Sequence, residues 1–426
     1  MYRIGVDVGG TNTDSAILDV TAYKSPSRGV LASYKSSTTP DITSGVQKAI
    51  EQVLAKSKIH KEDDLSVNIG TTHFVNAVVE ADARRLTKVA IVRLCGPFTK
   101  QIPPFSDFPA DLKEIMNGGT YYIDGGLEID CREITPLDPV QVKNTVAQII
   151  STGITTICLV GVFSPLDRSG IHEDRCKAIM LEVDPSLTII CSHKIGTIGL
   201  LERENATILN ASILAIAKKA FRSFGKAMSK VGLLCPLYIA QNDGTLTDSA
   251  SAAEFPVKTF ASGPTNSMIG AAFLAGLDKP RMTENAINGD VSATQVLVVD
   301  VGGTTTDVCA LLPSGYPRQA SNFMEVGGVR TAFSMPEVCS IGLGGGCRVN
   351  ENRETGQVTF GPESVGHFLT SKALVFGGDL MTSTDIMVAS KKHFMGNPEL
   401  VSHIPANMLA AARKQITKML EPSSFV

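Results

Sequence analysis

Hydrophobic residues along the chain fall into short apolar runs and into longer stretches where they recur at helical spacing. The short runs predict strands at 2–8, 14–20, 30–35, 65–69, 87–94, 154–162 and 233–240. Helical spacing predicts helices at 42–56, 140–150, 202–228, 266–276, 382–390 and 406–420. Segment 96–132 is rich in Gly and Pro and predicts an irregular insertion, and the polar segment 278–291 predicts a surface loop. The alternation of strands and helices indicates an α/β fold with covered sheets.

Composition and charge narrow the class of protein. The chain has 426 residues and a formal net charge of −3, with 43% hydrophobic and 19% charged residues. Such a chain can bury a large core, and its length predicts two or three domains. We expect no nucleic-acid or membrane partner, because the charge is near neutral and no apolar run reaches about 18 residues. The N-terminal segment does not resemble a secretory signal, so we expect a cytoplasmic protein.

The nine cysteines are odd in number and include no Cys-x-x-Cys pair. Several lie in apolar runs, which predicts reduced and mostly buried thiols rather than disulfides or a zinc site. Cys339 is interpreted as a packed thiol, with a nucleophile as the alternative.

One segment of the sequence occurs twice. Residues 6–14 read VDVGGTNTD, and residues 299–307 read VDVGGTTTD, with a single difference between the copies. Each copy lies between two apolar runs, which predicts a β-hairpin with a Gly-Gly-Thr tip. The P-loop and the dinucleotide-binding fingerprint lead into a helix and therefore do not fit.

The composition of this tip suits a nucleotide's phosphates. Glycines let the backbone approach a ligand, and consecutive N–H groups with threonine hydroxyls form an anion site. The predicted phosphate cradle consists of Gly9, Gly10, Thr11, Thr13, Gly302, Gly303, Thr304 and Thr306. Asp7 and Asp300 precede the glycines and are predicted to anchor Mg²⁺, which makes both of them catalytic candidates. Asp14 and Asp307 end the hairpins and either position a metal or water or cap the turn.

This duplication is similar to that of the actin, sugar-kinase and heat-shock-chaperone ATPase superfamily, in which each of two RNase H-like lobes contributes one phosphate hairpin. The wording DVGGTxTD resembles more narrowly the hydantoinase A and 5-oxoprolinase family. Further segments resemble that family in order along residues 2–395, namely 69–80, 163–173, 192–211, 262–272 and 341–346. The forms SGPTNSM and SIGLGGG resemble its short branch. The resemblance implies an N-terminal lobe at 1–195 and a hydantoinase A-type lobe at 196–426.

The resemblance also implies a function. The family consists of ATP-dependent hydrolases that open cyclic amides, so we expect ATP and Mg²⁺ as cofactors and a hydantoin, 5-oxoproline or a similar lactam as substrate. We expect the amide oxygen to be phosphorylated, with a companion resembling hydantoinase B or the thiohydantoin desulfurases as a subunit or fused domain. One alternative is another ATP-using enzyme of this fold, either a small-molecule kinase or a ketone carboxylase subunit. The other is a truncated, non-catalytic protein that binds a partner.

The sequence departs from the superfamily after the second hairpin. There the superfamily has a glycine loop that holds adenosine, and no such loop follows Asp307 at the expected distance. We therefore expect the C-terminal part to be incomplete relative to the family, as a truncated product, an altered gene end or one piece of a split protein.

Six other residues, in four places along the chain, are candidates, and each place has two interpretations. The glycines Gly344, Gly345 and Gly346 form a ligand-facing turn or a structural bend. His172, followed by Glu173, contacts substrate or metal, or the pair opens a helix whose N-terminus favours an acid. Glu204 is a catalytic carboxylate, or it belongs with Glu202 and Arg203 to a solvated cluster at a helix start. His73 has a substrate role or lies on a helix surface.

Overall fold

The computed structural model describes residues 1–9, 12–37, 41–71, 73–167, 171–260, 262–278, 296–320, 323–332, 335–352, 355–391 and 394–421. The chain forms two compact units, Met1–Asn266 with Gln319–Met335, and Ser267–Arg318 with Pro336–Val426. The predicted division into lobes at 195/196 falls inside the first unit and stays a prediction. The predicted loop at 278–291 lies almost wholly outside the described residues.

The first unit contains a six-stranded sheet in the order β10-β9-β4-β1-β2-β3. The strands β1 (Tyr2–Val8), β2 (Asn12–Asp19) and β3 (Val30–Ser37) are antiparallel neighbours. β4 (Leu65–Thr71) runs parallel to β1, and β9 (Leu237–Ala240) runs parallel to β4. β10 (Leu246–Asp248) is the edge strand and runs antiparallel to β9. Strand order and directions are those expected of an RNase H-like lobe, and α1 (Ile42–Ser57) covers β1, β2 and β3.

A second sheet in this unit is parallel throughout, in the order β6-β5-β7-β8. Its strands are β5 (Val89–Leu94), β6 (Asn117–Ile123), β7 (Thr156–Gly161) and β8 (Thr188–Cys191), with helices α4 (Pro139–Ser151) and α5 (Ile171–Val183) packed on it. Every residue of β5 is buried, as its apolar sequence predicts. The irregular insertion predicted for 96–132 is wrong in part, because α3 (Ala110–Met116) and β6 lie within it. β6 is an edge strand that begins Asn-Gly-Gly, which hides its strand signal.

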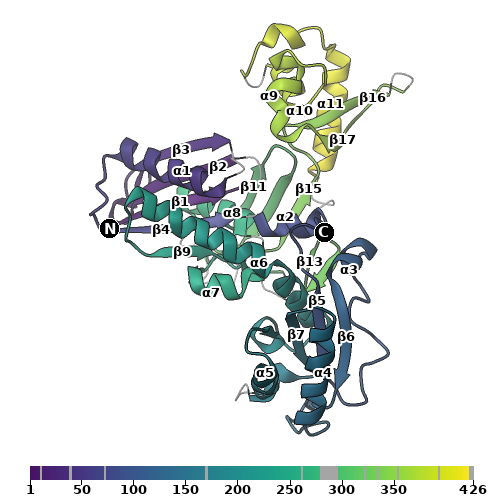
Figure 1. Cartoon of the computed structure of the whole chain (residues 1–426). Helices are drawn as coiled ribbons and strands as arrows, with labels where there is room; N and C mark the ends of the chain where they lie inside the picture. The colour runs from purple at the N-terminus through teal and green to yellow at the C-terminus, as the bar shows by residue number, and fades with distance from the viewer. Residues whose placement is uncertain are drawn as a thin grey trace, which may run out of the picture. The chain divides into compact units, whose positions relative to one another are not determined.

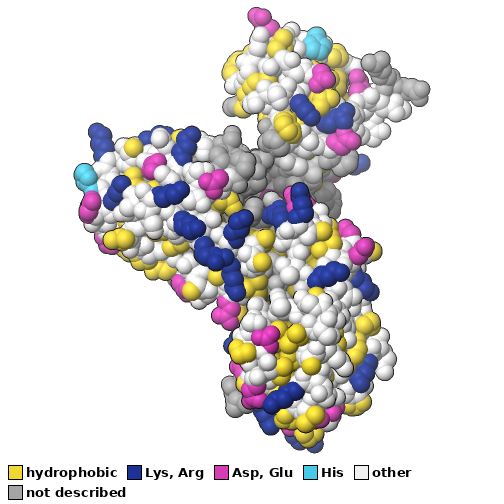
Figure 2. Space-filling model, viewed as in Figure 1, with side chains coloured by type: hydrophobic (Ala, Val, Ile, Leu, Met, Phe, Trp, Pro, Cys, Tyr) yellow, Lys and Arg dark blue, Asp and Glu magenta, His cyan; other side chains and the backbone are white. Residues whose placement is uncertain are grey.

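The long helix α6 (Leu200–Val231) joins these two sheets into one core, and the predicted helix at 202–228 is confirmed. It contacts α1 and α2 (His73–Val79) beside the six-stranded sheet and β5, β7 and β8 of the other sheet (Figure 1). Residues 203–214 of α6 are buried on every side, whereas its second half is amphipathic. There Lys218, Arg222, Lys226 and Lys230 recur every four residues on the exposed face, and Figure 2 shows Lys and Arg side chains gathered over this helix.

Smaller elements complete the first unit. They are α7 (Ser249–Glu254), the 3-10 helices η3 (Ser192–Lys194) and η4 (Pro256–Thr259), and the hairpin of β13 (Met324–Val326) and β14 (Val329–Thr331). The helix predicted at 266–276 is α8 (Ser262–Leu274).

The second unit begins within α8 and contains, among its described residues, a three-stranded antiparallel sheet in the order β11-β12-β15. Its strands β11 (Val296–Val301), β12 (Thr306–Leu311) and β15 (Val338–Ile341) repeat the arrangement of β1, β2 and β3. The hairpin of β16 (Cys347–Asn352) and β17 (Gln357–Ser364) packs with α9 (Leu369–Lys372), α10 (Ser383–Ala389) and α11 (Ala406–Met419) around a separate apolar core. The helices predicted at 382–390 and 406–420 are confirmed.

The thiol prediction holds, since all nine cysteines are free and six of them are buried. Among the helices of the described residues, we find none that is both long and apolar enough to cross a membrane.

Candidate functional site

The two copies of the repeated segment fold into hairpins of the same geometry. In the first, Asp7 lies opposite Asp14, and the N–H of Gly9 donates to the carbonyl of Asn12 at 3.0 Å. In the second, the opposed carboxylates are those of residues 300 and 307, and the N–H of residue 302 donates to the carbonyl of residue 305 at 2.8 Å. The two sequence copies therefore have the same strand pairing and the same hydrogen bond closing the turn. One copy lies in each unit.

The predicted cradle residues divide into two groups. Gly302, Gly303 and Thr304 form an exposed tip, in which the N–H of Gly302 is already engaged by the turn closure. Thr13 and Thr306 are buried, and the hydroxyl of Thr306 donates to the carbonyl of Leu343, so its role in the structure is to hold the fold. Gly10 and Thr11 lie outside the described residues.

The acidic pair of the second hairpin has the electrostatics of a cation site. Burial raises the pKa of Asp307, the hydroxyl of Ser340 lowers it, and the nearby Asp300 raises it again, with a net upward shift. A divalent cation between hairpin and phosphate would offset this repulsion, and carboxylates are the side chains that Mg²⁺ prefers. The residues present therefore fit a magnesium ion.

The acidic pair of the first hairpin has different neighbours. Asp14 forms an ion pair with Lys35 at 3.2 Å. Asp7 lies next to Gly70 of β4, where an added Cβ would be 2.6 Å from Nδ2 of Asn266 and 3.2 Å from Oδ1 of Asp7. Gly70 thus keeps open the space in which these two side chains lie. Asn266, within the SGPTNSM segment, thus lies near Asp7, and the sequence interpretation did not single it out.

The glycine loop packs directly on the tip of the second hairpin. The N–H groups of Gly345 and Gly346 donate to the carbonyls of Gly302 and Gly303 at 3.0 and 2.7 Å. A Cβ on Gly344 would lie 2.5 Å from the backbone nitrogen of Thr304, which explains why glycine stands there. The loop therefore supports the tip, and a direct ligand contact of Gly344, Gly345 or Gly346 stays a prediction.

Glu204, the predicted catalytic carboxylate, lies in the interior. Its two oxygens accept bonds from Nε and Nη2 of Arg93 at 2.9 and 2.5 Å, and both side chains are fully buried. Burial raises the pKa of Glu204, and the guanidinium of Arg93 opposes that shift. The interpretation of residues 202–204 as a solvated cluster is wrong, because Arg203 is fully buried as well. The catalytic role of Glu204 stays a prediction, although its geometry is that of a structural ion pair between α6 and β5.

His172, the other predicted catalytic residue, is also buried. Its Nε2 accepts the N–H of Gly126 at 2.8 Å, and its Nδ1 lies 3.6 Å from the carboxylate of Glu133. Burial lowers the pKa of His172, and the neighbouring carboxylates oppose that shift. A neutral ring that holds a loop is consistent with these contacts, so catalysis by His172 also stays a prediction. The side chain of His73, which begins α2, is outside the description.

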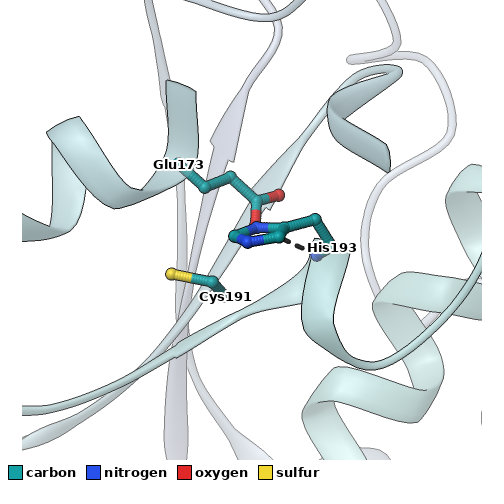
Figure 3. Close-up of side chains that lie close together, drawn as sticks. All are labelled: Glu173, Cys191 and His193. Carbon is teal, nitrogen blue, oxygen red and sulfur yellow. Dashed lines mark hydrogen bonds and ion pairs between the residues drawn. The ribbon is translucent and has the colours of Figure 1, made fainter. Parts of the chain in front are cut away.

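The first turn of α5, which also contains His172, presents a buried carboxylate, that of Glu173. Oε1 of Glu173 accepts bonds from the N–H of Gly161 and the hydroxyls of Ser164 and Ser192 at 2.6–2.7 Å. Oε2 accepts the backbone N–H of His193 at 3.1 Å and lies 2.7 Å from its ring Nδ1 (Figure 3). Burial acts to raise the pKa of Glu173, but these hydrogen bonds outweigh it, so the pKa is lowered and the group is ionised at neutral pH.

Cys191 lies close to this pair, and the three side chains are near enough to share a metal ion (Figure 3). Burial raises the pKa of the Cys191 thiol, and this thiol donates to the carboxylate of Asp174 at 3.7 Å. Both oxygens of Glu173 are already engaged by protein donors. The arrangement is better described as a carboxylate–histidine pair.

A cavity of about 350 Å³ lies beside this pair within the first unit. Its wall is formed by His193, Lys194, Ile195, Gly196, Thr197, Gln241, Asn242, Asp243, Lys258 and Ala332. Most of these residues follow the C-terminal end of β8, in the parallel sheet, or of β9, in the six-stranded sheet; in α/β sheets ligands bind at the C-terminal ends of parallel strands. That position was the available signal for His193, which the sequence interpretation quoted within a motif but gave no role.

Comparison with protein families gives two matches, which together contain both hairpins. Residues 3–184 match the hydantoinase/oxoprolinase N-terminal region, and residues 203–392 match the hydantoinase/oxoprolinase domain. The chain belongs to the hydantoinase/oxoprolinase family. Both hairpins of this hydantoinase/oxoprolinase chain fall within the matched residues.

Curated relatives extend the comparison. The caprolactamase subunit alpha of Pseudomonas jessenii is 24% identical over 394 residues, which are 86% of this chain and 51% of that subunit. The acetophenone carboxylase gamma subunit of Aromatoleum aromaticum is 23% identical over 259 residues, which are 59% of this chain and 33% of that subunit. This family member therefore spans about half of the first relative and about a third of the second.

Two solved structures share the fold. The ATP-dependent caprolactamase from Pseudomonas jessenii superposes with a TM-score of 0.69 at 20% identity, covering 97% of this chain and 61% of that one. A nucleotide-free acetone carboxylase superposes with a TM-score of 0.64 at 18% identity, covering 98% and 59%. The expected α/β fold with ATPase-type lobes is confirmed.

Proposed function

We propose that this chain is the ATP-dependent activating component of a cyclic amide hydrolase, and that it phosphorylates the amide oxygen of a lactam or hydantoin ring. The observation that carries the proposal is the hairpin repeated in both units, with the same opposed aspartates and the same tip closure. Membership of the hydantoinase/oxoprolinase family and the likeness to caprolactamase subunit alpha support it.

The chemistry explains why an anion-binding tip and a cation are needed. An amide carbonyl is a poor electrophile, and transfer of the γ-phosphate to its oxygen turns that oxygen into a leaving group that water can displace. The protein's contribution to phosphoryl transfer is to position the reactants and to stabilise charge. We assign phosphate binding to each hairpin tip and magnesium binding to the aspartate that precedes it, Asp7 or Asp300, where an ion would neutralise charge on the phosphates.

We further propose that a companion subunit or domain completes the hydrolysis. The support is that the two relatives described above, caprolactamase subunit alpha and the acetophenone carboxylase gamma subunit, are themselves subunits. A hydantoinase B-like or thiohydantoin-desulfurase-like component fits this role.

The first test is a thermal melt with and without millimolar MgATP. A ligand at 100 times its Kd stabilises by about 2.7 kcal/mol, which raises the midpoint by several degrees. Asp7→Asn and Asp300→Asn should reduce this shift, whereas Asp64→Asn, on the exposed turn before β4, should keep it. A cooperative melt without any MgATP shift would contradict the ATPase proposal and favour the non-catalytic, partner-binding alternative.

The second test measures ADP release with 5-oxoproline, hydantoin and caprolactam, with the companion subunit present. Loss of one charge-stabilising aspartate should lower the rate by roughly 10²–10³. A carboxylase subunit is the second candidate, because the acetophenone carboxylase match and the acetone carboxylase fold favour it. ADP release that requires a ketone and bicarbonate would select it, and a stable phosphorylated product would select a kinase.

A further inference from the structure

The ring of His193 is held in one orientation by a single buried carboxylate. Three of the bonds to Glu173 fix its Oε1, and the other two join Oε2 to the backbone N–H and the ring Nδ1 of His193. Because the same oxygen holds both the backbone and the ring, the imidazole has little freedom to rotate. Its side chain is 15% exposed, while that of Glu173 is fully buried.

This arrangement fixes which ring nitrogen can accept a proton. The pKa of Glu173 is lowered, so an ionised carboxylate faces Nδ1, and Nδ1 must therefore be the donor. In the neutral ring the lone pair then lies on Nε2. Within the described chain, Nε2 makes no hydrogen bond, and the carboxylate of Asp174 lies 3.8 Å from it, an ion-pair distance when the ring is protonated. Lys194 lies 3.6 Å from the other oxygen of Asp174.

The cavity wall next to His193 is fixed by a second buried side chain. Arg203 donates from Nε to the hydroxyl of Ser192 at 2.9 Å and from Nη2 to the carbonyl of Gly161 at 2.6 Å. Its Nη1 donates to the carbonyls of the wall segment 197–199 at 2.8–3.3 Å. Arg203 and Glu173 thus share Ser192, and one buried network holds both the histidine and the adjoining backbone.

The cavity has the size and polarity for one small polar ring. Its volume of about 350 Å³ is at the lower end of the range for small-molecule sites. Two lysines and one aspartate, Asp243, line it beside the histidine. Lys258, on η4, holds its ammonium group over the ring of Phe255, 5.0 Å from the ring centroid, and lines the cavity with Lys194.

We propose that this cavity binds the cyclic amide and that His193, oriented by Glu173, is the base that removes the proton from the ring nitrogen during phosphorylation. The inference rests on the proposed function. As the amide oxygen attacks the γ-phosphorus, the new O–P bond forms and the bond from phosphorus to the β,γ-bridging oxygen breaks, with its electron pair leaving on ADP. The N–H proton passes to Nε2 of His193, and the ring gains a C=N bond. The product is a neutral imidate with its phosphate, and His193 is left protonated.

The first experiment separates this catalytic role from folding. We compare wild type, His193→Gln and Glu173→Gln with His60→Gln, an exposed histidine, as the control. The MgATP melting shift should be kept in His193→Gln, while lactam-dependent ADP release should fall by about 10²–10⁴. Imidazole added to His193→Ala should restore part of the rate. The acidic limb of the wild-type pH–rate profile should be absent in His193→Gln. An unchanged rate and profile in His193→Gln would overturn the proposal, and so would stoichiometric zinc bound to the pair.

The second experiment does not depend on ATP. Diethyl pyrocarbonate modifies an accessible imidazole nitrogen, and mass spectrometry reports the modification of His193 against that of His60. Protection of His193, but not of His60, by 5-oxoproline, hydantoin or caprolactam supports the cavity as the ring site even if MgATP fails to bind and the proposed function is wrong. Modification of His193 that none of the three rings slows, in a chain that does bind MgATP, overturns the inference while leaving the proposed function intact.

Discussion

The buried pair Arg93–Glu204 allows the structural and catalytic interpretations of Glu204 to be told apart. Glu204→Gln removes the negative charge and leaves the guanidinium of Arg93 in the core with two N–H groups facing a neutral amide. Its remaining bonds, to the carbonyls of Thr99 and Ile102, do not compensate the charge. Breaking one partner of a buried pair costs about 3–5 kcal/mol, because the other charge stays desolvated.

The expected change is large enough to measure by melting. At about 2–4 °C per kcal/mol for a unit of this size, Glu204→Gln should lower the first unit's Tm by roughly 6–20 °C. The double variant Arg93→Met/Glu204→Leu should be less destabilised than the single variant, because it leaves no buried charge. The control is Glu182→Gln, which breaks the exposed Lys143–Glu182 pair and should cost at most about 1 kcal/mol.

We would measure circular dichroism melts of wild type, Glu204→Gln, the double variant and Glu182→Gln. Lactam-dependent ADP release would then be measured for each variant that folds. If Glu204→Gln melts within about 2 °C of wild type and yet loses activity, then the carboxylate acts in the reaction, and the assignment to a structural ion pair is refuted.

Three further outcomes follow from the structure. The pKa of Glu173 is lowered from 4.5, so its stabilising contribution is present above that pH and lost as the pH falls through the folded value; melts between about pH 7 and 3 should show this loss, and Glu173→Gln should flatten it. Gly344→Ala should lower both the Tm of the second unit and the MgATP shift, because its Cβ would meet Thr304, whereas Gly342→Ala meets nothing within 4 Å and should melt like wild type. Cys131, which is exposed, should react first with an aromatic disulfide reagent in the native chain, and the buried thiols should react only after unfolding, as thiol counting will show.

The sequence predicts the hairpins well because their geometry is local. Glycine and threonine at the tip and aspartate two positions before it specify the turn, and the register of Asp7 with Asp14 follows from strands of fixed length. The partner of Glu204 was not predictable in this way, because Arg93 is 111 positions away and meets it only when α6 packs on β5. Likewise, the role of His193 depends on Glu173, which reaches it from a different helix.

The beginning of α6 has a consequence for how the first unit opens. Successive helical residues point about 100° apart, and here Arg203, Glu204 and Asn205 each meet a different partner: the cavity wall, β5, and the carboxylate of Asp107 together with the backbone of β14. One turn of helix is therefore bonded to three separate parts of the unit: the cavity wall, β5, and Asp107 together with β14. None of these parts can move away from α6 while the turn stays folded and keeps its bonds. A local fluctuation that released only one of these three partners would leave a buried charged or polar side chain without its hydrogen bonds. Opening of the first unit should therefore be a single cooperative event, in which the amides of this turn exchange with solvent only when the whole unit unfolds.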